Sequence, residues 1–207
     1  MLIFLISILL IIFSYFFIDR QLVWFLVEHQ SRRFKILALF ANGITSFIAI
    51  FIFLYYIIFF IKFSVSSLKE FDKKLIIVCN SVVISAFIKD IVKIIFGRYW
   101  TATFNCNNPS LISNHVYGFN WLKSGNAYGS FPSGHTVFIF SFSVSLWILF
   151  PRLRWLWSML AFCVIFGQIG IYYHFVSDVI AGVTLGSWIG LYNTFYSLES
   201  KRLLTYL

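Results

Sequence analysis

Two short segments hold the residues of this chain best suited to chemistry. The first reads Ser-Phe-Pro-Ser-Gly-His at 130–135, and the second reads His-Phe-Val-Ser-Asp at 174–178. A histidine can attack phosphorus directly when a carboxylate fixes its tautomer and stabilises the developing imidazolium. His174 and Asp178 suit that pairing, and His135 suits a group that protonates a leaving oxygen and then activates water. These residue types indicate phosphoryl transfer through a histidine nucleophile.

The residues before His135 add an expected anion-binding turn. Ser133 and Gly134 precede a predicted helix start, where a hydroxyl and free backbone N–H groups can receive a phosphate. The sequence has no Walker loop, no His-Glu-x-x-His motif and no carboxylate cluster suited to two metal ions. We therefore expect no metal and no other cofactor. The three cysteines, at 79, 106 and 163, lack the spacing of a zinc site or a disulfide framework.

The composition places these motifs in a membrane protein. The chain of 207 residues is 60% hydrophobic and 22% aromatic, and only 11% of its residues are charged. Soluble domains carry about 25% charged residues, so a soluble fold has no way to bury this much apolar surface. The net charge of +9 comes mostly from Lys and Arg in short connections between apolar runs, where they orient a protein in the bilayer. We therefore expect no nucleic-acid partner.

Apolar runs of the required length, about 17–25 residues, predict an all-α polytopic fold of six spans. We expect one membrane-embedded domain over residues 1–207, with Asp19–Lys35 as an interfacial helix or a re-entrant turn and 98–131 as a long loop. The predicted spans are 2–18, 36–63, 75–97, 134–150, 155–173 and 176–196.

This topology brings the candidate residues to one membrane face. With a cytoplasmic N-terminus, eight basic residues lie on the inner side and six on the outer side, so the long loop is predicted to face outward. Arg98, His135, His174 and Asp178 then stand at the outer ends of spans three to six.

Two other patterns leave alternatives open. The glycines at 182, 186 and 190 form a small-residue stripe, which indicates close packing within the bundle or a homodimer face. The sequence does not decide the oligomeric state. The Trp and Tyr residues of the long loop indicate either an interfacial aromatic belt or an acyl or sugar site.

The two motifs together resemble signatures of the type 2 phosphatidic acid phosphatase family. Residues 130–135 are similar to its second motif, and His174-x3-Asp178 is similar to the end of its third, within a resemblance over roughly 89–182. The resemblance implies that His174 is the nucleophile, that Asp178 orients it and that His135 is the acid and base. It also implies that the hydroxyl of Ser133 and the backbone of Gly134 bind phosphate oxygens.

The same resemblance implies what the protein does and where. Members of the family include bacterial lipid phosphatases, which implies hydrolysis of a lipid phosphomonoester or diphosphate without a metal ion. The implied partner is a membrane lipid phosphate. The implied location is a bacterial inner (cell) membrane, with the site facing the periplasm or the exterior.

The chain departs from the family pattern at its cations. The first family motif, Lys-x6-Arg-Pro, implies phosphate binding by Lys93 and Arg98, but their spacing here is shorter and Trp100 stands at the Arg position. The Arg position of the third motif is Gln168, which can contact a phosphate only through an uncharged amide. Loss of a charged contact to the transferring phosphoryl group costs about 2–4 kcal/mol, or roughly 30- to 1,000-fold in rate. Lys89, Lys93 or Lys123 are the candidates to replace that charge.

These departures and the charges in the third span leave alternatives open for the function of the chain and for the role of Lys93. The chain is either an active phosphatase or a degenerate relative that binds lipid phosphate without efficient turnover. A transporter would need a polar path across the spans, whereas the charges lie near one end of the third span. Lys93 either binds the phosphate or forms a structural pair with Asp90.

Overall fold

Helices make up nearly all of the regular structure in the computed structural model, which describes residues 2–65, 68–104 and 107–204. Cys106 lies outside the described residues. Within them there are no strands, only isolated bridges in the long loop. The elements are α1 (Leu2–Phe17), α2 (Asp19–Glu28), η1 (Ser31–Arg33), α3 (Lys35–Ala38), the π-helical η2 (Leu39–Gly43), α4 (Ile44–Val65), α5 (Glu70–Phe96), α6 (Leu111–Asn114), η3 (Asn126–Tyr128), α7 (Gly134–Leu149), η4 (Pro151–Leu153), α8 (Arg154–Gly170) and α9 (Val176–Leu204).

Each predicted apolar segment is helical, with shifted ends. Helix α5 begins before the predicted span because the backbone N–H of Lys69 donates to the Asp72 carboxylate, which caps an earlier turn. Helix α8 ends at Gly170, before the predicted end of its span, and α9 continues beyond its predicted end to Leu204. The prediction of an all-α fold is confirmed.

Length and composition support membrane insertion for part of this set. Three helical stretches of the described chain are long and apolar enough to cross a membrane, at Lys35–Val65, Glu70–Phe96 and Pro151–Gly170. The pair α1 and α2, bent by 54° at their junction, makes a fourth if it is taken as one span. Large apolar side chains such as Phe47 and Phe87 are exposed, as expected for surfaces that face lipid. The count of six spans stays a prediction.

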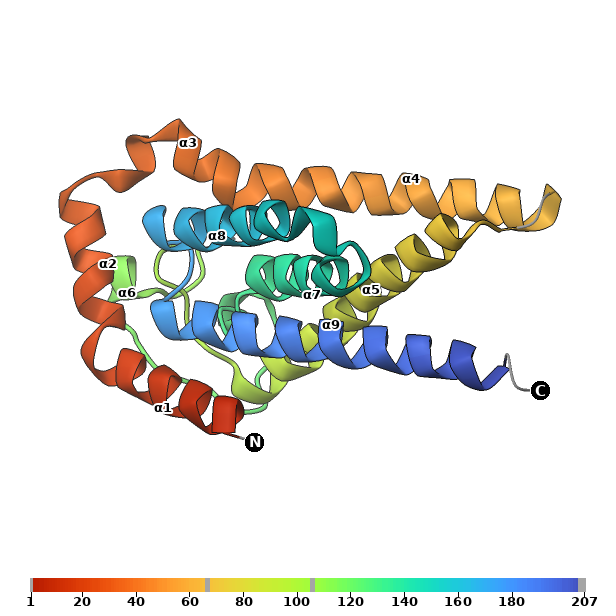
Figure 1. The fold of residues 1–207 in the computed structure, drawn as a ribbon. Coiled ribbons are helices and arrows are strands. Elements are labelled where there is room, and N and C mark those ends of the chain that lie inside the picture. The colour runs from red at the N-terminus through yellow and green to blue at the C-terminus, as the bar shows by residue number, and fades with distance from the viewer. Residues whose placement is uncertain (1, 66–67, 105–106, 205–207) are drawn as a thin grey trace.

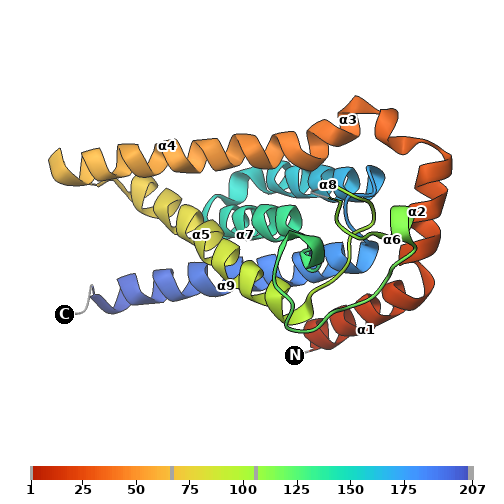
Figure 2. The ribbon, with the colours of Figure 1, turned by 180° about the vertical axis from the view of Figure 1, so that it is seen from behind.

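Helix α7 is the centre of the bundle. It packs against α5, α8 and α9, and Figures 1 and 2 show it enclosed by these helices, with α4 along the outer side of α8. The glycine stripe of α9 lets the backbones of α9 and α7 approach closely. A Cβ at Gly186 would lie 2.4 Å from the carbonyl oxygen of Val137, which is too near for any side chain. This stripe therefore packs within one chain, as the first of the two alternatives predicted.

Buried hydroxyls join α7 to its neighbours. Ser85 of α5 pairs with Ser141 of α7 at 3.0 Å, and the Ser145 hydroxyl of α7 donates to Ser81 of α5 at 2.9 Å. Asn193 of α9 donates to the same Ser81 at 2.8 Å. These bonds fix the register of α5, α7 and α9, because a polar group left unpaired between apolar helices is costly.

One end of the bundle gathers the irregular structure. The long loop with α6, the turn between α8 and α9, and helix α2 all lie at this end, opposite the C-terminal end of α9 (Figures 1 and 2). The segment predicted as an interfacial helix or re-entrant turn forms α2 and η1. Helix α2 therefore lies beside the long loop 98–131 and beside the start of α9.

Candidate active site

The two motif histidines line one pocket at this end of the bundle. His135 stands in the first turn of α7, and His174 lies in the turn between α8 and α9. The pocket has a volume of 360 Å³. Its other lining residues come from α4, α5, α7 and the loops: Thr45, Ser46, Ala49, Lys89, Lys93, Trp100, Gly134, Phe138 and Tyr173.

Asp178 faces one ring nitrogen of His174. The distance from His174 Nδ1 to Asp178 Oδ2 is 3.5 Å, and Ser130 Oγ lies at the same distance from that nitrogen. The carboxylate is itself held, because Oδ2 accepts from the Ser130 hydroxyl at 2.7 Å and from the Phe175 backbone N–H at 3.1 Å. With Nδ1 directed at Asp178, Nε2 is the nitrogen of His174 that can meet a substrate.

Burial tunes the His174 imidazole. The side chain is almost fully buried, and this burial lowers the pKa of His174 below its usual value, although the neighbouring Asp178 carboxylate acts in the opposite direction. The ring is therefore neutral at pH 7 and keeps the lone pair that a nucleophile needs.

Arg98 reaches the site but does not line the pocket. Its side chain is fully buried, and its guanidinium donates to Asp178 Oδ1, to Ser177 Oγ at 2.6 Å and to Asp19 Oδ2 at 2.7 Å. Burial acts to lower the pKa of Arg98, but the two carboxylates outweigh it and raise that pKa. The predicted phosphate ligand thus binds the carboxylate partner of His174 within the described structure.

Two lysines of α5 supply positive charge to the pocket. Lys93 Nζ donates to the carbonyl oxygen of Gly129 at 2.6 Å, and Lys89 Nζ pairs with Asp90 at 2.8 Å. The structural pair predicted as an alternative, between Asp90 and Lys93, is therefore replaced by one between neighbouring residues. Lys93 remains beside the pocket.

The anion-binding turn is only partly at the pocket. Gly134 lines it, whereas Ser133 is fully buried and its hydroxyl accepts a hydrogen bond from Thr136 Oγ1 at 2.9 Å. The Ser133 backbone N–H donates to the Asp178 carbonyl oxygen at 3.0 Å, which ties the starts of α7 and α9 together. The structure brings Gly134 to the histidine pocket, whereas Ser133 does not line it.

Gln168 also lies outside the pocket. It is fully buried, and its Nε2 donates to the carbonyl oxygen of Ala41 in η2 at 2.7 Å. A Cβ on the preceding Gly167 would lie 2.4 Å from the backbone nitrogen of Ala41. The departure from the third family motif therefore coincides with close packing of α8 on the π-helical turn.

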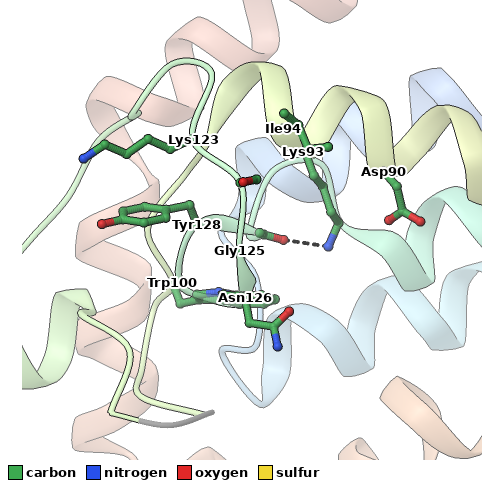
Figure 3. Close-up of a pocket in the computed structure, with 10 residues that line it drawn as sticks. Asp90, Lys93, Ile94, Trp100, Lys123, Gly125, Asn126 and Tyr128 are labelled. Carbon is green, nitrogen blue, oxygen red and sulfur yellow. Dashed lines mark hydrogen bonds between the residues drawn. The ribbon is translucent and has the colours of Figure 1, made fainter.

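A second pocket adjoins the first on the loop side. It has a volume of 290 Å³ and shares Lys93 and Trp100 with the histidine pocket. In Figure 3 the dashed line from the Lys93 amino group is its hydrogen bond to the Gly129 carbonyl oxygen, and the Lys123 side chain points away from Lys93. Lys123, a candidate for the missing charge, thus belongs to the outer pocket.

Asp19 is the main site residue that the sequence motifs did not indicate. Its side chain is fully buried at the start of α2 and accepts hydrogen bonds from Arg98, Ser177 and Tyr117. The available signal was its position, since an acidic residue that ends an apolar run needs a partner if it is buried. The sequence did not say which partner.

Comparisons with known proteins agree with this arrangement. The PAP2 superfamily matches residues 74–201, more than half of the chain. A lipid A 1-phosphatase of Rhizobium johnstonii is 35% identical over 80 residues, which are 37% of this chain and 33% of that protein. The bacitracin transport permease protein BcrC of Bacillus licheniformis is 33% identical over 104 residues, 50% of each chain. No solved structure matches.

These relatives are matched over part of their length. The chain spans between a third and a half of the curated relatives just described. The superfamily match itself runs from α5 through α9 and includes the pocket lysines, both histidines and Asp178. By this match over most of its helices, the chain belongs to the PAP2 superfamily.

Proposed function

We propose that this protein is an integral membrane phosphatase that hydrolyses a lipid phosphomonoester or diphosphate through a phosphohistidine. The observation that carries the proposal is the single pocket that contains His135, His174 and two lysines, with Asp178 behind the second histidine. Superfamily membership and the relative named as a lipid A 1-phosphatase support the same reaction class.

The reaction takes place in two displacements. The Nε2 lone pair of His174 attacks phosphorus, and the bond from phosphorus to the lipid-side oxygen breaks as protonated His135 gives that oxygen its proton and becomes neutral. A water molecule then attacks the phosphohistidine while His135 accepts its proton. The phosphorus–nitrogen bond breaks, inorganic phosphate leaves, and both imidazoles return to their starting state.

The lysines and the α7 start hold the phosphate in this proposal. Lys89 and Lys93 offset the charge of the phosphoryl oxygens, and backbone N–H groups at Gly134 and His135 bind them at the helix start. Arg98 acts on Asp178 and does not contact the phosphate. Gln168 acts on the packing of α8.

The deciding experiment is phosphate release by purified protein over a panel of lipids. The panel contains phosphatidic acid, phosphatidylglycerophosphate, undecaprenyl diphosphate and lipid A, and His174→Ala is the blank. We expect release from at least one lipid, its loss in His174→Ala and His135→Ala, and no effect of EDTA because the nucleophile is an imidazole. Unchanged release in His174→Ala would contradict the mechanism.

A second candidate function is lipid-phosphate binding without efficient turnover. It is favoured by the placement of Gln168 and Arg98, since neither brings a charge to the pocket. Binding of the same lipids by a wild-type protein that releases no phosphate, together with weaker binding by Lys93→Met, would support this function. Efficient release would exclude it.

A further inference from the structure

We propose that Asp19 is a positioning residue for the nucleophile, which balances Arg98 so that the negative charge of Asp178 stays available to His174. The inference rests on the proposed function and adds to it a residue from outside the matched region 74–201. It follows from the contacts of one buried guanidinium.

Asp19 is bound at both carboxylate oxygens. Oδ1 accepts from the Ser177 backbone N–H at 3.0 Å. Oδ2 accepts from Arg98 Nη2 at 2.7 Å, from the Ser177 hydroxyl and from the Tyr117 hydroxyl at 3.1 Å. Asp19 therefore contacts the residue next to Asp178 as well as the cation that binds Asp178.

The charges of this cluster explain why a second carboxylate is useful. Arg98 donates from Nη1 to Asp178 and from Nη2 to Asp19, and all three side chains are fully buried. One cation between two anions leaves a net charge of about −1 beside His174, which stabilises the imidazolium that forms on attack. Without Asp19, Arg98 would neutralise Asp178 and no net negative charge would remain.

The geometry also limits movement of the nucleophile. Asp19 starts α2 at the 54° bend after α1, and through Ser177 it holds the first turn of α9, which carries Asp178. A purely structural role would use only this link. The charge role and the structural role therefore predict different behaviour when Arg98 is changed together with Asp19.

The test compares Asp19→Asn, Asp19→Glu, Arg98→Gln and the double variant Asp19→Asn/Arg98→Gln in phosphate release. Loss of the outer partner of a metal-ligating histidine typically costs 10- to 100-fold, and by analogy we expect Asp19→Asn to lower kcat by about that factor with KM changed less than about 3-fold. Asp19→Glu should recover part of the loss.

The double variant should have a kcat several-fold higher than Asp19→Asn, because removing both charges leaves the negative charge of Asp178 unopposed. Glu28→Gln, at the exposed end of the same helix, is the matched control and should match wild type.

A pH profile gives a readout that a structural role would not move. Without the Asp19 charge, the His174 imidazolium is less stabilised, so the acidic limb of kcat should move to lower pH in Asp19→Asn. The other ionisable groups that act on His174 are Asp178 and Lys93, and His174 in turn acts on His135. All three are unchanged in Asp19→Asn. The double variant should return the limb toward wild type.

Three outcomes would overturn the inference. Unchanged kcat in Asp19→Asn, with release lost in His174→Ala, overturns it alone and leaves the proposed function standing. Equal losses in Asp19→Asn and in the double variant, with no shift of the acidic limb, assign Asp19 a structural role instead. No release by wild-type protein overturns both proposals.

Discussion

The His174 ring faces Asp178 at Nδ1, and its side chain is almost fully buried. The carboxylate favours the imidazolium, whereas burial favours the neutral ring, and burial is the larger effect. The lowered pKa has a direct consequence for activity. In the proposed mechanism a protonated ring has no lone pair for attack on phosphorus, so the rate should fall as pH falls through the pKa of His174.

The first prediction concerns pH. Because the pKa of His174 lies below the usual value of about 6.5, phosphate release should persist below pH 6.5 and decline only in more acidic solution. The measurement is kcat/KM against pH for two substrates whose phosphate groups ionise differently, since a phosphate monoester also titrates near pH 6. The limb that stays in place between substrates belongs to the protein. If the acidic limb that belongs to the protein lies at or above pH 6.5, the assignment to His174 is wrong.

Lys93 and Lys123 allow a matched comparison of the two pockets. Lys93 lines both pockets, and Lys123 lines only the outer one. Lys93→Met should lower kcat/KM by about 100-fold, as expected for loss of one charged donor to a transferring group. Lys123→Met should stay within about 3-fold of wild type. The reverse order in the same release assay would place the phosphate in the outer pocket.

At the scale of elements, the site depends on where α7 and α9 start. Ser133 bonds the carbonyl oxygen of Asp178, and the glycine stripe lets α9 approach α7 closely. Helix α8 is fixed differently, through the Gln168 amide on the π-helical η2. The side chain at the position that the family resemblance linked to phosphate thus bonds a neighbouring helical turn in the structure.

A substitution at Gln168 separates packing from chemistry. Gln168→Ala removes the donor that bonds the Ala41 carbonyl, and an unpaired buried acceptor costs about 1–3 kcal/mol. We expect the free energy of unfolding to fall by that amount and phosphate release by folded protein to change less than about 3-fold. Thermal unfolding in detergent and the release assay measure the two effects, with exposed Gln21→Ala as the control. A large loss of phosphate release without loss of stability would indicate that Gln168 contacts the phosphate.

At the scale of the whole molecule, the irregular segments gather at one end of the bundle, and the turn before α8 lies at the other (Figure 1). The charge distribution predicts that the first end faces outward. In a background with its cysteines replaced by alanine, Ser124→Cys and Arg152→Cys carry a label to opposite ends. A membrane-impermeant maleimide on intact cells should react with the first and reach the second only after permeabilisation. Reaction of the second alone would reverse the orientation.

The sequence by itself determined the class of the protein and named the residues that we propose as its reacting groups. Apolar content and run length indicate membrane helices without reference to tertiary contacts, because each helix satisfies its own backbone in lipid. The spacing of His174 and Asp178 indicates a paired imidazole because both lie within one turn of chain. The order of the helices also predicted that Arg98, His135, His174 and Asp178 would meet, and the structure brings them together.

Only the tertiary structure decided which partner each remaining polar group takes. By its chemistry alone, Arg98 could bind a phosphate, Asp178 or Asp19. It binds both carboxylates because α2 folds back beside α9. The Gln168 amide donates to the carbonyl oxygen of Ala41, which lies 127 positions away in the chain, and Gln168 does not line the pocket. A motif names the donors and acceptors in a segment, but the partner of a buried side chain is set by which distant helix approaches it. For this reason the proposed nucleophile and its carboxylate partner could be named from sequence, whereas the positions of the charges around them could not.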